Sequence, residues 1–590
     1  MRTPVVRHGF LEGAGPPLFA SYHEPGPGAP ARNVAYVLCL PLHLELIQAY
    51  RSMRSFAEEL AAAGFHVMRV HYDGTGESVG STDRDPDRVA AWQDSVRRAV
   101  EVMAKIPNVE SVGLAGVRIG AAFAMDTAAR LDISHLVLWE PVSGAMYARE
   151  MEILASSAPQ KVPGGVVAGG YFMSEPTSKD LARLDLEKME PRGKPAVLLV
   201  YRGDRRPPPR LQQHFEKLGC ATTMVQLAGH KEMMVMPHKS AVPSLVIDAI
   251  RQWAVERSHA VGEGAAATLA SAALATETVA SGVRWRSFWF GAKDHLFGVM
   301  SEPEAGATAG KPAVLLLTGG VTPRTSGNGS YVALAQRLAA KGHVVMRMDV
   351  ACIGESRTLD DVMGNGNDGF PPSVVDDARA GLERLCAGVA AGTEVWLLGL
   401  CSGAYAAFQT MLADARVRGA FLMNPVTLHL RDPDAATAAS GDGVPGDDAM
   451  TKVDQLEQMQ RYLSLIRDPE SWKKVLTGKA NVRHIAGIVG ARLGARLASA
   501  KETLAVRLGR TPKGLGRDLD EVLARSAHVH LVFSEGDPGH PLVTTELGAR
   551  FEELSRKGLK TKIFPGADHN FHEMASRAEL LDWVVQTIDT

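Results

Sequence analysis

Several features that point to specialised protein classes are scarce in this sequence. Its 590 residues include only five cysteines, at positions 39, 220, 352, 386 and 401, with no C-x-x-C pair among them. An odd, scattered set of this kind argues against a disulfide framework or a zinc site and favours a reducing compartment. The histidines show no H-E-x-x-H or paired ligand spacing, so we expect no metal and no cofactor.

Long apolar runs and an excess of one charge are also missing. No stretch reaches transmembrane length and the first residues lack the apolar run of a signal peptide, so we expect a cytoplasmic protein without a transmembrane segment. A net charge of -2 with 22% charged residues gives no reason to expect nucleic acid as a partner. A hydrophobic content of 45% in a chain of this length predicts two or more globular domains.

Apolar strand-like runs and helical stretches alternate through residues 34–255. This alternation predicts an α/β fold, with a mostly parallel sheet covered by helices on both faces, over residues 1–257. Residues 258–282 are rich in Ala, Gly, Ser and Thr, which is typical of a linker. Residues 283–590 then repeat the same alternation as a second domain.

Local sequence also repeats between the halves. Leu60-Ala61-Ala62-Ala63-Gly64-Phe65-His66-Val67-Met68-Arg69 corresponds to Leu338-Ala339-Ala340-Lys341-Gly342-His343-Val344-Val345-Met346-Arg347, and Gly76-Glu77-Ser78 corresponds to Gly354-Glu355-Ser356. These matches indicate a tandem duplication. Duplicated domains often meet through equivalent surfaces, so packing of the halves as a pseudo-dimer is one alternative, which no residue pattern in the sequence decides.

The second half contains a strand, a glycine-flanked turn and a helix in succession. Gly399-Leu400-Cys401-Ser402-Gly403 follows an apolar run and precedes a helical stretch, which is the pattern of a nucleophile elbow. The sharp turn requires small residues two positions before and two after the nucleophile. Glycines hold both positions when Cys401 is central, whereas Ser402 as the centre places Leu400 and Ala404 there. Cys401 is the predicted nucleophile, and a buried, inert cysteine is the alternative.

Two further candidate groups follow strands later in the chain. Asp537 ends the run Leu531-Val532-Phe533-Ser534-Glu535-Gly536-Asp537, and His569 ends Pro565-Gly566-Ala567-Asp568-His569. The order nucleophile, acid, histidine predicts a triad in which the imidazole takes the thiol proton and the carboxylate fixes its tautomer. Glu535 and His572 are rivals for the acid and the histidine. The predicted oxyanion donors are the amides of Ser402 and of Gly320 or Val321.

The first half has the same turn without a nucleophile. Gly116-Val117-Arg118-Ile119-Gly120 places Arg118 at the centre, and a guanidinium cannot attack a carbonyl. Asp204 and His230 stand where the acid and the histidine would follow, so this half is predicted to be a catalytically inactive copy. Arg118 either holds an anionic ligand group or pairs with Asp204.

A long insertion separates the strand ending near Asn424 from the strand beginning near Val529. We expect it to form a helical lid over about residues 427–525. Residues 481–517, which include its second helical stretch, are basic and carry Arg492, Arg496, Arg507 and Arg510. This surface is either a solvated face or a docking surface for an acidic partner, such as an acyl carrier protein or a phosphopantetheine-bearing cofactor.

With the elbow, the acid strand and the Gly-x-x-His turn in place, the chain resembles the α/β-hydrolase superfamily. The first half resembles the exosortase A system-associated hydrolases, through Gly116-Val117-Arg118-Ile119-Gly120-Ala121, Trp139-Glu140-Pro141-Val142-Ser143-Gly144 and Gly169-Gly170-Tyr171. The second half resembles Cys-nucleophile members such as dienelactone hydrolase and polyhydroxyalkanoate synthase. That resemblance implies acyl chemistry through Cys401.

Two functional hypotheses follow. The first is an enzyme that takes an acyl group from a thioester or ester, possibly carried on an acyl carrier protein or coenzyme A, onto Cys401 and passes it to water or another nucleophile. Such an enzyme is a thioesterase, an esterase or an acyltransferase. The second is a non-catalytic binding or scaffold protein in which both elbows are vestigial.

Overall fold

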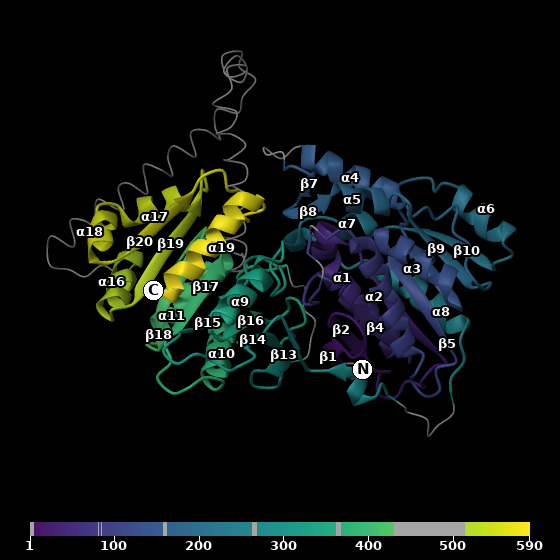
Figure 1. The fold of residues 1–590 in the computed structure, drawn as a ribbon, viewed down its shortest axis with the longest axis horizontal. Coiled ribbons are helices and arrows are strands. Elements are labelled where there is room, and N and C mark those ends of the chain that lie inside the picture. Colours follow the sequence, from purple (N-terminus) through teal and green to yellow (C-terminus); the bar gives the residue numbers. More distant parts are fainter. Residues whose placement is uncertain are drawn as a thin grey trace, which may run out of the picture.

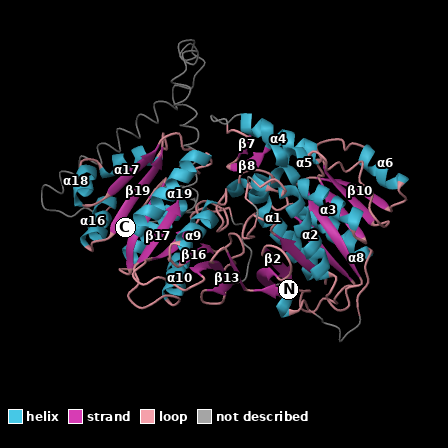
Figure 2. Cartoon of the chain, viewed as in Figure 1, coloured by secondary structure: helices cyan, strands magenta, loops and turns pink. Residues whose placement is uncertain are grey.

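A computed structural model describes residues 5–80, 82–83, 85–156, 162–261, 268–360, 367–429 and 514–590. Two nine-stranded sheets, one in each half of the chain, lie side by side (Figure 1). Helices cover the sheets on both faces (Figure 2). The predicted fold class, two mostly parallel sheets flanked by helices, is therefore confirmed. In this described part of the chain, no helix is long and apolar enough to cross a membrane.

The first sheet has the strand order β10-β9-β6-β5-β3-β4-β2-β1-β11. Its strands are β1 (Val6–Leu11), β2 (Leu18–His23), β3 (Val34–Cys39), β4 (His66–Val70), β5 (Ser111–Val117), β6 (His135–Trp139), β9 (Ala196–Arg202), β10 (Thr222–Leu227) and β11 (Leu274–Ala275). The six strands from β10 to β4 pair in parallel, and β2, β1 and β11 pair antiparallel.

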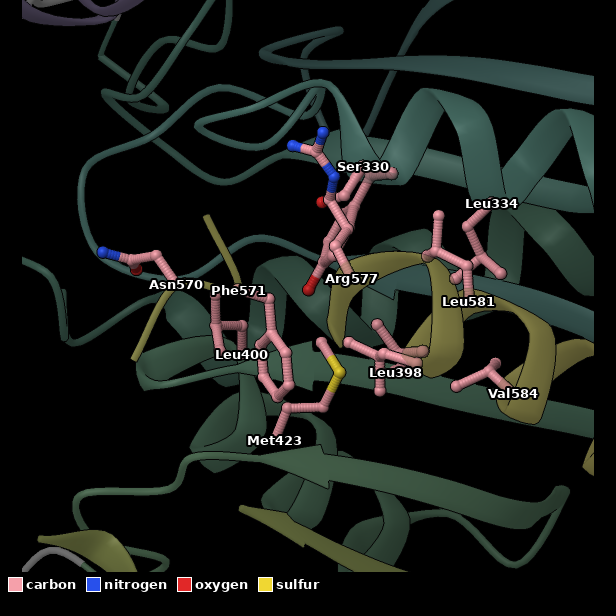
Figure 3. Close-up of a pocket in the computed structure, with 12 residues that line it drawn as sticks. Ser330, Leu334, Leu398, Leu400, Met423, Asn570, Phe571, Arg577, Leu581 and Val584 are labelled. Atoms are coloured by element: carbon pink, nitrogen blue, oxygen red, sulfur yellow. The ribbon is translucent and has the colours of Figure 1, made fainter. Parts of the chain in front are cut away.

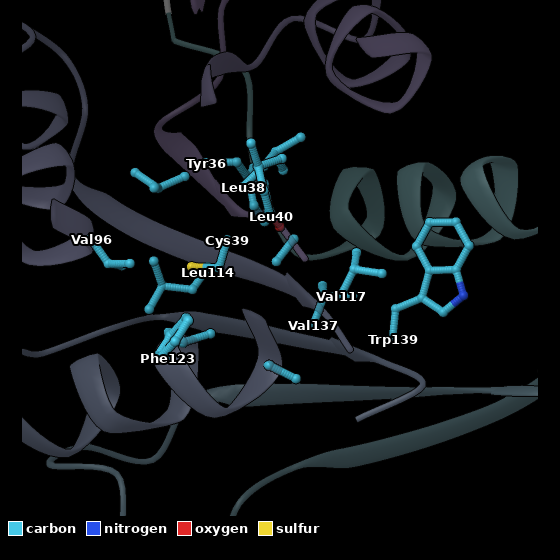
Figure 4. Close-up of a cluster of buried hydrophobic side chains, with 14 of the residues drawn as sticks. Tyr36, Leu38, Cys39, Leu40, Val96, Leu114, Val117, Phe123, Val137 and Trp139 are labelled. Carbon is cyan, nitrogen blue, oxygen red and sulfur yellow. The ribbon is translucent and has the colours of Figure 1, made fainter. Parts of the chain in front are cut away.

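Helices on both faces bury the central strands of this sheet. They are α1 (His43–Ala62), α2 (Arg88–Met103), α3 (Ile119–Arg130), α4 (Gly144–Ser156), α5 (Glu175–Leu181), α6 (Arg210–Lys217), α7 (His230–Met233) and α8 (Ser244–Glu256). Every residue of β3 is buried, because helices pack above and below it. Tyr36, Leu38, Cys39 and Leu114 belong to the resulting core (Figure 4). A separate hairpin, β7 (Gly165–Ala168) with β8 (Tyr171–Ser174), follows α4.

The second sheet repeats the strand order of the first. It runs β12-β13-β14-β16-β15-β17-β18-β19-β20. Its strands are β12 (Glu277–Ala280), β13 (Val283–Phe290), β14 (Leu296–Pro303), β15 (Ala313–Leu317), β16 (Val345–Asp349), β17 (Val395–Leu400), β18 (Val417–Met423), β19 (His528–Ser534) and β20 (Lys560–Phe564). Its helices are α9 (Ser330–Ala340), α10 (Val374–Cys386), α11 (Ser402–Ala413), α16 (Leu515–Ala524), α17 (Gly539–Leu547), α18 (Arg550–Lys557) and α19 (Met574–Asp589).

Most of the predicted lid, residues 430–513, lies outside the described residues. Its predicted end, near residue 525, includes α16, which packs against α11 and α18. The basic residues Arg492, Arg496, Arg507 and Arg510 also lie outside the described part.

The predicted linker, residues 258–282, does more than join the halves. Its described part contributes β11, which pairs with β1 of the first sheet, and β12, which pairs with β13 of the second. The outer strands β1 and β13 would otherwise present unpaired backbone groups at a sheet edge, and the passing chain pairs with them. The segment therefore completes both sheets.

Reciprocal buried ion pairs join the halves. Arg69 on β4 pairs with Glu355 of the second half at 2.8 Å, and Arg347 on β16 pairs with Glu77 of the first half at 2.8 Å. All four side chains are at most 2% exposed. The arginines are equivalent positions of the repeated sequence, and so are the glutamates. The contact therefore has the pseudo-twofold character of an isologous dimer interface.

Candidate functional site

Cys401 occupies the turn between β17 and α11 with a strained backbone. Its φ of 56° and ψ of -115° are rarely adopted by a residue with a side chain. A Cβ on Gly399 would lie 2.0 Å from the carbonyl oxygen of Gly403, and a Cβ on Gly403 would lie 2.3 Å from the carbonyl oxygen of Leu317. Only glycine fits at these two positions, which is why the chain can make an elbow with Cys401 at its centre.

The loops after β19 and β20 bring Asp537 and His569 together. His569 Nδ1 and Asp537 Oδ2 lie 2.6 Å apart, and the Asp537 side chain is fully buried. The backbone N–H of Gly539 donates to Asp537 Oδ1 at 2.8 Å, so a backbone donor fixes the carboxylate plane. His569 is about one-third exposed, so its ring is accessible from solvent.

The electrostatics of His569 link it to Cys401 as well as to Asp537. Burial disfavours the charged imidazolium. The hydrogen bonds with Asp537 and with Cys401, and the negative charges of those two groups, outweigh burial and raise the pKa of His569 well above its ordinary value. The protonation of His569 therefore depends on both Asp537 and Cys401.

The rival acid and the rival histidine have other partners. Glu535 Oε2 accepts a hydrogen bond from the backbone N–H of Gly566 at 2.9 Å. His572 Nδ1 lies 2.7 Å from Asp568 Oδ2. Asp537 and His569 therefore pair with each other, whereas the two rivals do not pair with either of them.

The predicted oxyanion donors lie in the loop after β15 and at the start of α11. Ser402 is the first residue of α11, and its hydroxyl accepts a hydrogen bond from the Gly320 N–H at 2.8 Å. For Gly320 to hold an oxyanion, the Ser402 hydroxyl must release this N–H. The backbone amide of Ser402 itself is at the helix N-terminus, where the dipole favours negative charge. The Val321 amide is the alternative to Gly320.

A small apolar pocket lies behind the elbow, between α9, α19 and strands β17 and β18 (Figure 3). Leu400, Met423 and Phe571 are among the residues that line it. Its volume is about 20 Å³, which is room for little more than one water molecule. This pocket does not accommodate an acyl chain.

Burial affects the acidity of three other thiols in the described part of the chain. Burial raises the pKa of Cys39, Cys220 and Cys386 above the ordinary value. These three thiols are therefore protonated at neutral pH, and protonated thiols are poor nucleophiles.

In the first half, Arg118 has the elbow geometry but not the predicted partner. Its φ of 55° and ψ of -121° match those of Cys401. Its guanidinium pairs with Glu45 on α1 at 2.8 Å and with Glu150 on α4, so the predicted pairing with Asp204 is wrong. Asp204 is about half exposed and binds Arg202, two residues away, instead. Two carboxylates already neutralise Arg118, which weakens the alternative that it holds an anionic ligand.

His230 is buried in the first half. Burial, with the charges of Arg118 and Arg202, lowers the pKa of His230 to about 3. The ring is therefore neutral at physiological pH. In the described structure, Asp204 binds Arg202, so His230 and Asp204 have no hydrogen bond like the one between His569 and Asp537.

Asn424 is a residue that the sequence reasoning missed. It has a φ of 43° and follows β18. Its side chain donates to the carbonyl oxygen of His569 at 2.8 Å and accepts from the backbone N–H of Ser534 at 2.8 Å. It thus ties the histidine loop to β19. The sequence contained a signal for this position. A residue followed by proline, Asn424-Pro425, comes directly after β18, and Glu140-Pro141 comes directly after the equivalent strand β6 of the first half.

Comparisons with known proteins bear on the second half. Residues 314–582 match the model of an alpha/beta hydrolase family. No curated protein matches the sequence. The tandem duplication and the exosortase-associated resemblance of the first half stay predictions.

Several solved structures show a partial likeness to this chain. Est1E from Butyrivibrio proteoclasticus is 18% identical with a TM-score of 0.33, over 42% of this chain and 98% of its own. XC6422 from Xanthomonas campestris, described as an a/b serine hydrolase without lid, is 19% identical with a TM-score of 0.28, over 43% and 93%. Such values say nothing about activity or substrate. Over residues 314–582, the second half of the chain is therefore similar to the alpha/beta hydrolase family.

Proposed function

We propose that the protein is an acyl-transfer enzyme that forms an acyl-thioester intermediate on Cys401. The observation that carries the proposal is the His569–Asp537 pair at 2.6 Å, with His569 also coupled to the Cys401 thiol at a strained elbow. A raised imidazole pKa favours the thiolate–imidazolium form of the pair, and the thiolate is the nucleophile.

In the first step, the Cys401 sulfur attacks the carbonyl carbon of a thioester or ester. The carbonyl π electrons move to oxygen, and the Ser402 amide with the Gly320 or Val321 amide stabilises that oxyanion. When the tetrahedral intermediate collapses, the bond to the leaving thiol or alcohol breaks and His569 gives it a proton. The products are acyl-Cys401 and neutral His569.

In the second step, neutral His569 takes a proton from the acceptor as it attacks acyl-Cys401. The bond between the acyl carbon and the Cys401 sulfur then breaks, which releases the product and restores the Cys401 thiolate beside the His569 imidazolium. Acylation removes the thiolate charge and its hydrogen bond, two of the causes that raise the pKa of His569. The imidazole therefore becomes free to act as a base at this stage. Thioesters react readily with amines and thiols but slowly with water, so a cysteine nucleophile favours acyl transfer or thioester substrates over plain ester hydrolysis. An acyl group on an acyl carrier protein or on coenzyme A fits this chemistry.

Intact-protein mass spectrometry tests the proposal directly. The protein is incubated with a panel of acyl thioesters and activated esters, and wild type is compared with Cys401→Ala. Cys386→Ala, which removes another partly exposed thiol, is the matched control. We expect a mass gain of one acyl group in wild type and in the control, and none in Cys401→Ala. An adduct that persists in Cys401→Ala contradicts the assignment, and the absence of adducts from every donor favours the binding or scaffold alternative.

A further inference from the structure

We propose that the first half, although it lacks a nucleophile, is a positioning element for the Cys401 site in the second half. It contacts both loops on which that site depends: the loop after β15, residues 318–329, and the loop after β20, residues 565–573. The inference rests on the proposed function, because it concerns the geometry of the same Cys401 and His569.

The first contact anchors the loop after β15 through Arg324. This guanidinium is fully buried, with Nε 3.0 Å from Glu77 Oε1 of the first half and an Nη 2.7 Å from Asp349 Oδ2 of the second. The Arg324 backbone N–H also donates to Asp349 Oδ1 at 2.6 Å. Arg324 lies four residues after Gly320, so a carboxylate from the first half holds the segment that carries the predicted oxyanion donors.

Aromatic rings from both halves enclose the same guanidinium. Its central carbon lies 4.4 Å from the ring centroid of Phe297 and 5.5 Å from that of Phe19. Phe19 belongs to β2 of the first sheet and Phe297 to β14 of the second. A buried cation between two carboxylates and two rings has one well-defined position, which fixes where the loop leaves β15.

The second contact is made by the turn between β7 and β8. The carbonyl oxygen of Gly170 accepts a hydrogen bond from Arg577 of α19 at 2.7 Å. A Cβ on Gly170 would lie 2.8 Å from the His572 ring and 2.9 Å from Asn328 Cβ. The tip of a first-half hairpin is therefore in close contact with the histidine loop and with the loop after β15.

Asn328 connects these two loops to each other. Its side-chain amide donates to the carbonyl oxygens of Asn570 at 3.3 Å and Phe571 at 3.1 Å, directly after His569. The hairpin tip thus touches a side chain that holds both loops together. A shift of Asn328 or His572 moves the His569 ring relative to Cys401.

Mere stabilisation of the interface is the competing explanation, and the pseudo-symmetry supplies its control. Glu355 makes the mirror-related ion pair with Arg69 and accepts a hydrogen bond from Tyr50 at 2.7 Å. Its carboxylate contacts first-half residues, whereas the Glu77 carboxylate contacts Arg324 of the catalytic loop. If the two carboxylates only stabilise the interface, removing either one should change the reactivity of Cys401 equally. If Glu77 positions the catalytic loop, removing it should change that reactivity more than removing Glu355 does.

Adjacent glycines give the sharper experiment. Gly170→Ala introduces a methyl group against His572 and Asn328, while Gly169→Ala introduces one 3.1 Å from Leu44 of the same half. Both residues have positive φ, 84° and 56°, so both substitutions strain the backbone. The difference between the two variants therefore reports what the methyl group meets in the second half.

The readout is the rate of Cys401 alkylation by iodoacetamide between pH 5 and pH 9.5, with the full-length chain and the melting temperature measured alongside. A free thiol reacts mainly at high pH, where it ionises, whereas a thiol paired with an imidazolium stays reactive at lower pH. A displacement of about 1 Å lowers the efficiency of a positioned group about 100-fold. We expect Gly170→Ala to lose about 10- to 100-fold in rate at pH 6 and little at pH 9.5, and Gly169→Ala to retain the wild-type profile.

The outcomes separate this inference from the proposed function. A wild-type profile of a simple free thiol overturns the proposed coupling of Cys401 to His569, and this inference with it. A coupled wild-type profile that is the same in Gly170→Ala overturns this inference alone. If Gly170→Ala does not fold, Glu77→Gln and Glu355→Gln decide in the same assay: a selective loss at pH 6 in Glu77→Gln supports positioning, and equal profiles refute it.

Discussion

The geometry around Asp537 makes a specific prediction for Asp537→Asn. One carboxylate oxygen accepts from the Gly539 N–H at 2.8 Å, and the other faces His569 Nδ1 at 2.6 Å. In the variant, the amide oxygen must face Gly539, because an NH₂ group there would oppose another donor. The NH₂ group then faces His569 Nδ1, which must accept. The imidazole proton is thereby forced onto Nε2, and the imidazolium, with donors on both nitrogens, is disfavoured.

The size of the effect follows from two contributions. Loss of a charge-assisted hydrogen bond is worth about 1.5–3 kcal/mol, which is about 10- to 150-fold in rate. Asp537→Ala loses this contribution only, because it leaves the tautomer free. Asp537→Asn loses it and also fixes the wrong tautomer, and in serine hydrolases the corresponding substitution lowers kcat about 10⁴-fold. We therefore expect the asparagine variant to be slower than the alanine variant, although its shape is closer to wild type.

Alkylation of Cys401 by iodoacetamide at pH 6, followed by intact-protein mass spectrometry, measures this order without a known substrate. Cys401→Ala gives the background from other thiols. An asparagine variant that reacts faster than the alanine variant contradicts the tautomer argument. Equal, unchanged rates in both would mean that Asp537 does not act on His569 at all.

Three further predictions concern the protonation, the interface and the elbow. Because the folded pKa of His569 is raised, the imidazolium persists above pH 6.5, and the alkaline limb of the kcat/KM profile should lie well above that pH. Acylation removes the thiolate, so a kcat that is limited by deacylation should show a lower pKa for His569 in its pH profile. Arg69→Met and Glu355→Leu should each lower the free energy of unfolding, measured by urea titration, by about 3–5 kcal/mol. The double variant should lose much less than the sum of the two, and additive losses would refute the energetic coupling of Arg69 to Glu355. Gly399→Ala should lower the free energy of unfolding by about 3 kcal/mol, the upper end for overpacking, and a change below 0.5 kcal/mol in thermal denaturation would contradict the close contact at the elbow.

Local patterns made much of the fold predictable. The central strands and the helices that follow them are coded by short runs of residues. Glycines two positions before and after Cys401 identify the elbow without knowledge of the rest of the chain. The order of Cys401, Asp537 and His569 needs only the additional rule that parallel strands present their carboxyl ends at one edge. The prediction of two mostly parallel sheets succeeded for these reasons.

Contacts between distant segments were beyond the sequence. Arg118 has Glu45 and Glu150 as partners because the fold brings α1 and α4 to the elbow. The order of residues along the chain had instead suggested Asp204. The pairing of Arg324 with Glu77 depends on how the halves dock, and a single sequence does not encode that in any local pattern. The strands formed by the predicted linker likewise exist only because sheet edges lie beside it.

The two elbows separate what the fold requires from what catalysis requires. Arg118 and Cys401 have nearly the same backbone angles, a conformation that costs about 1–3 kcal/mol for a residue with a side chain. The first half keeps this conformation without a nucleophile to expose. A Cβ on Gly120 would lie 2.1 Å from a carbonyl oxygen of β3, and one on Gly403 would lie 2.3 Å from a carbonyl oxygen of β15. In both halves the close packing of helix on strand imposes the turn, so the backbone geometry identifies the fold. The chemistry is identified only by the side chain at the centre of the turn and by the groups around it.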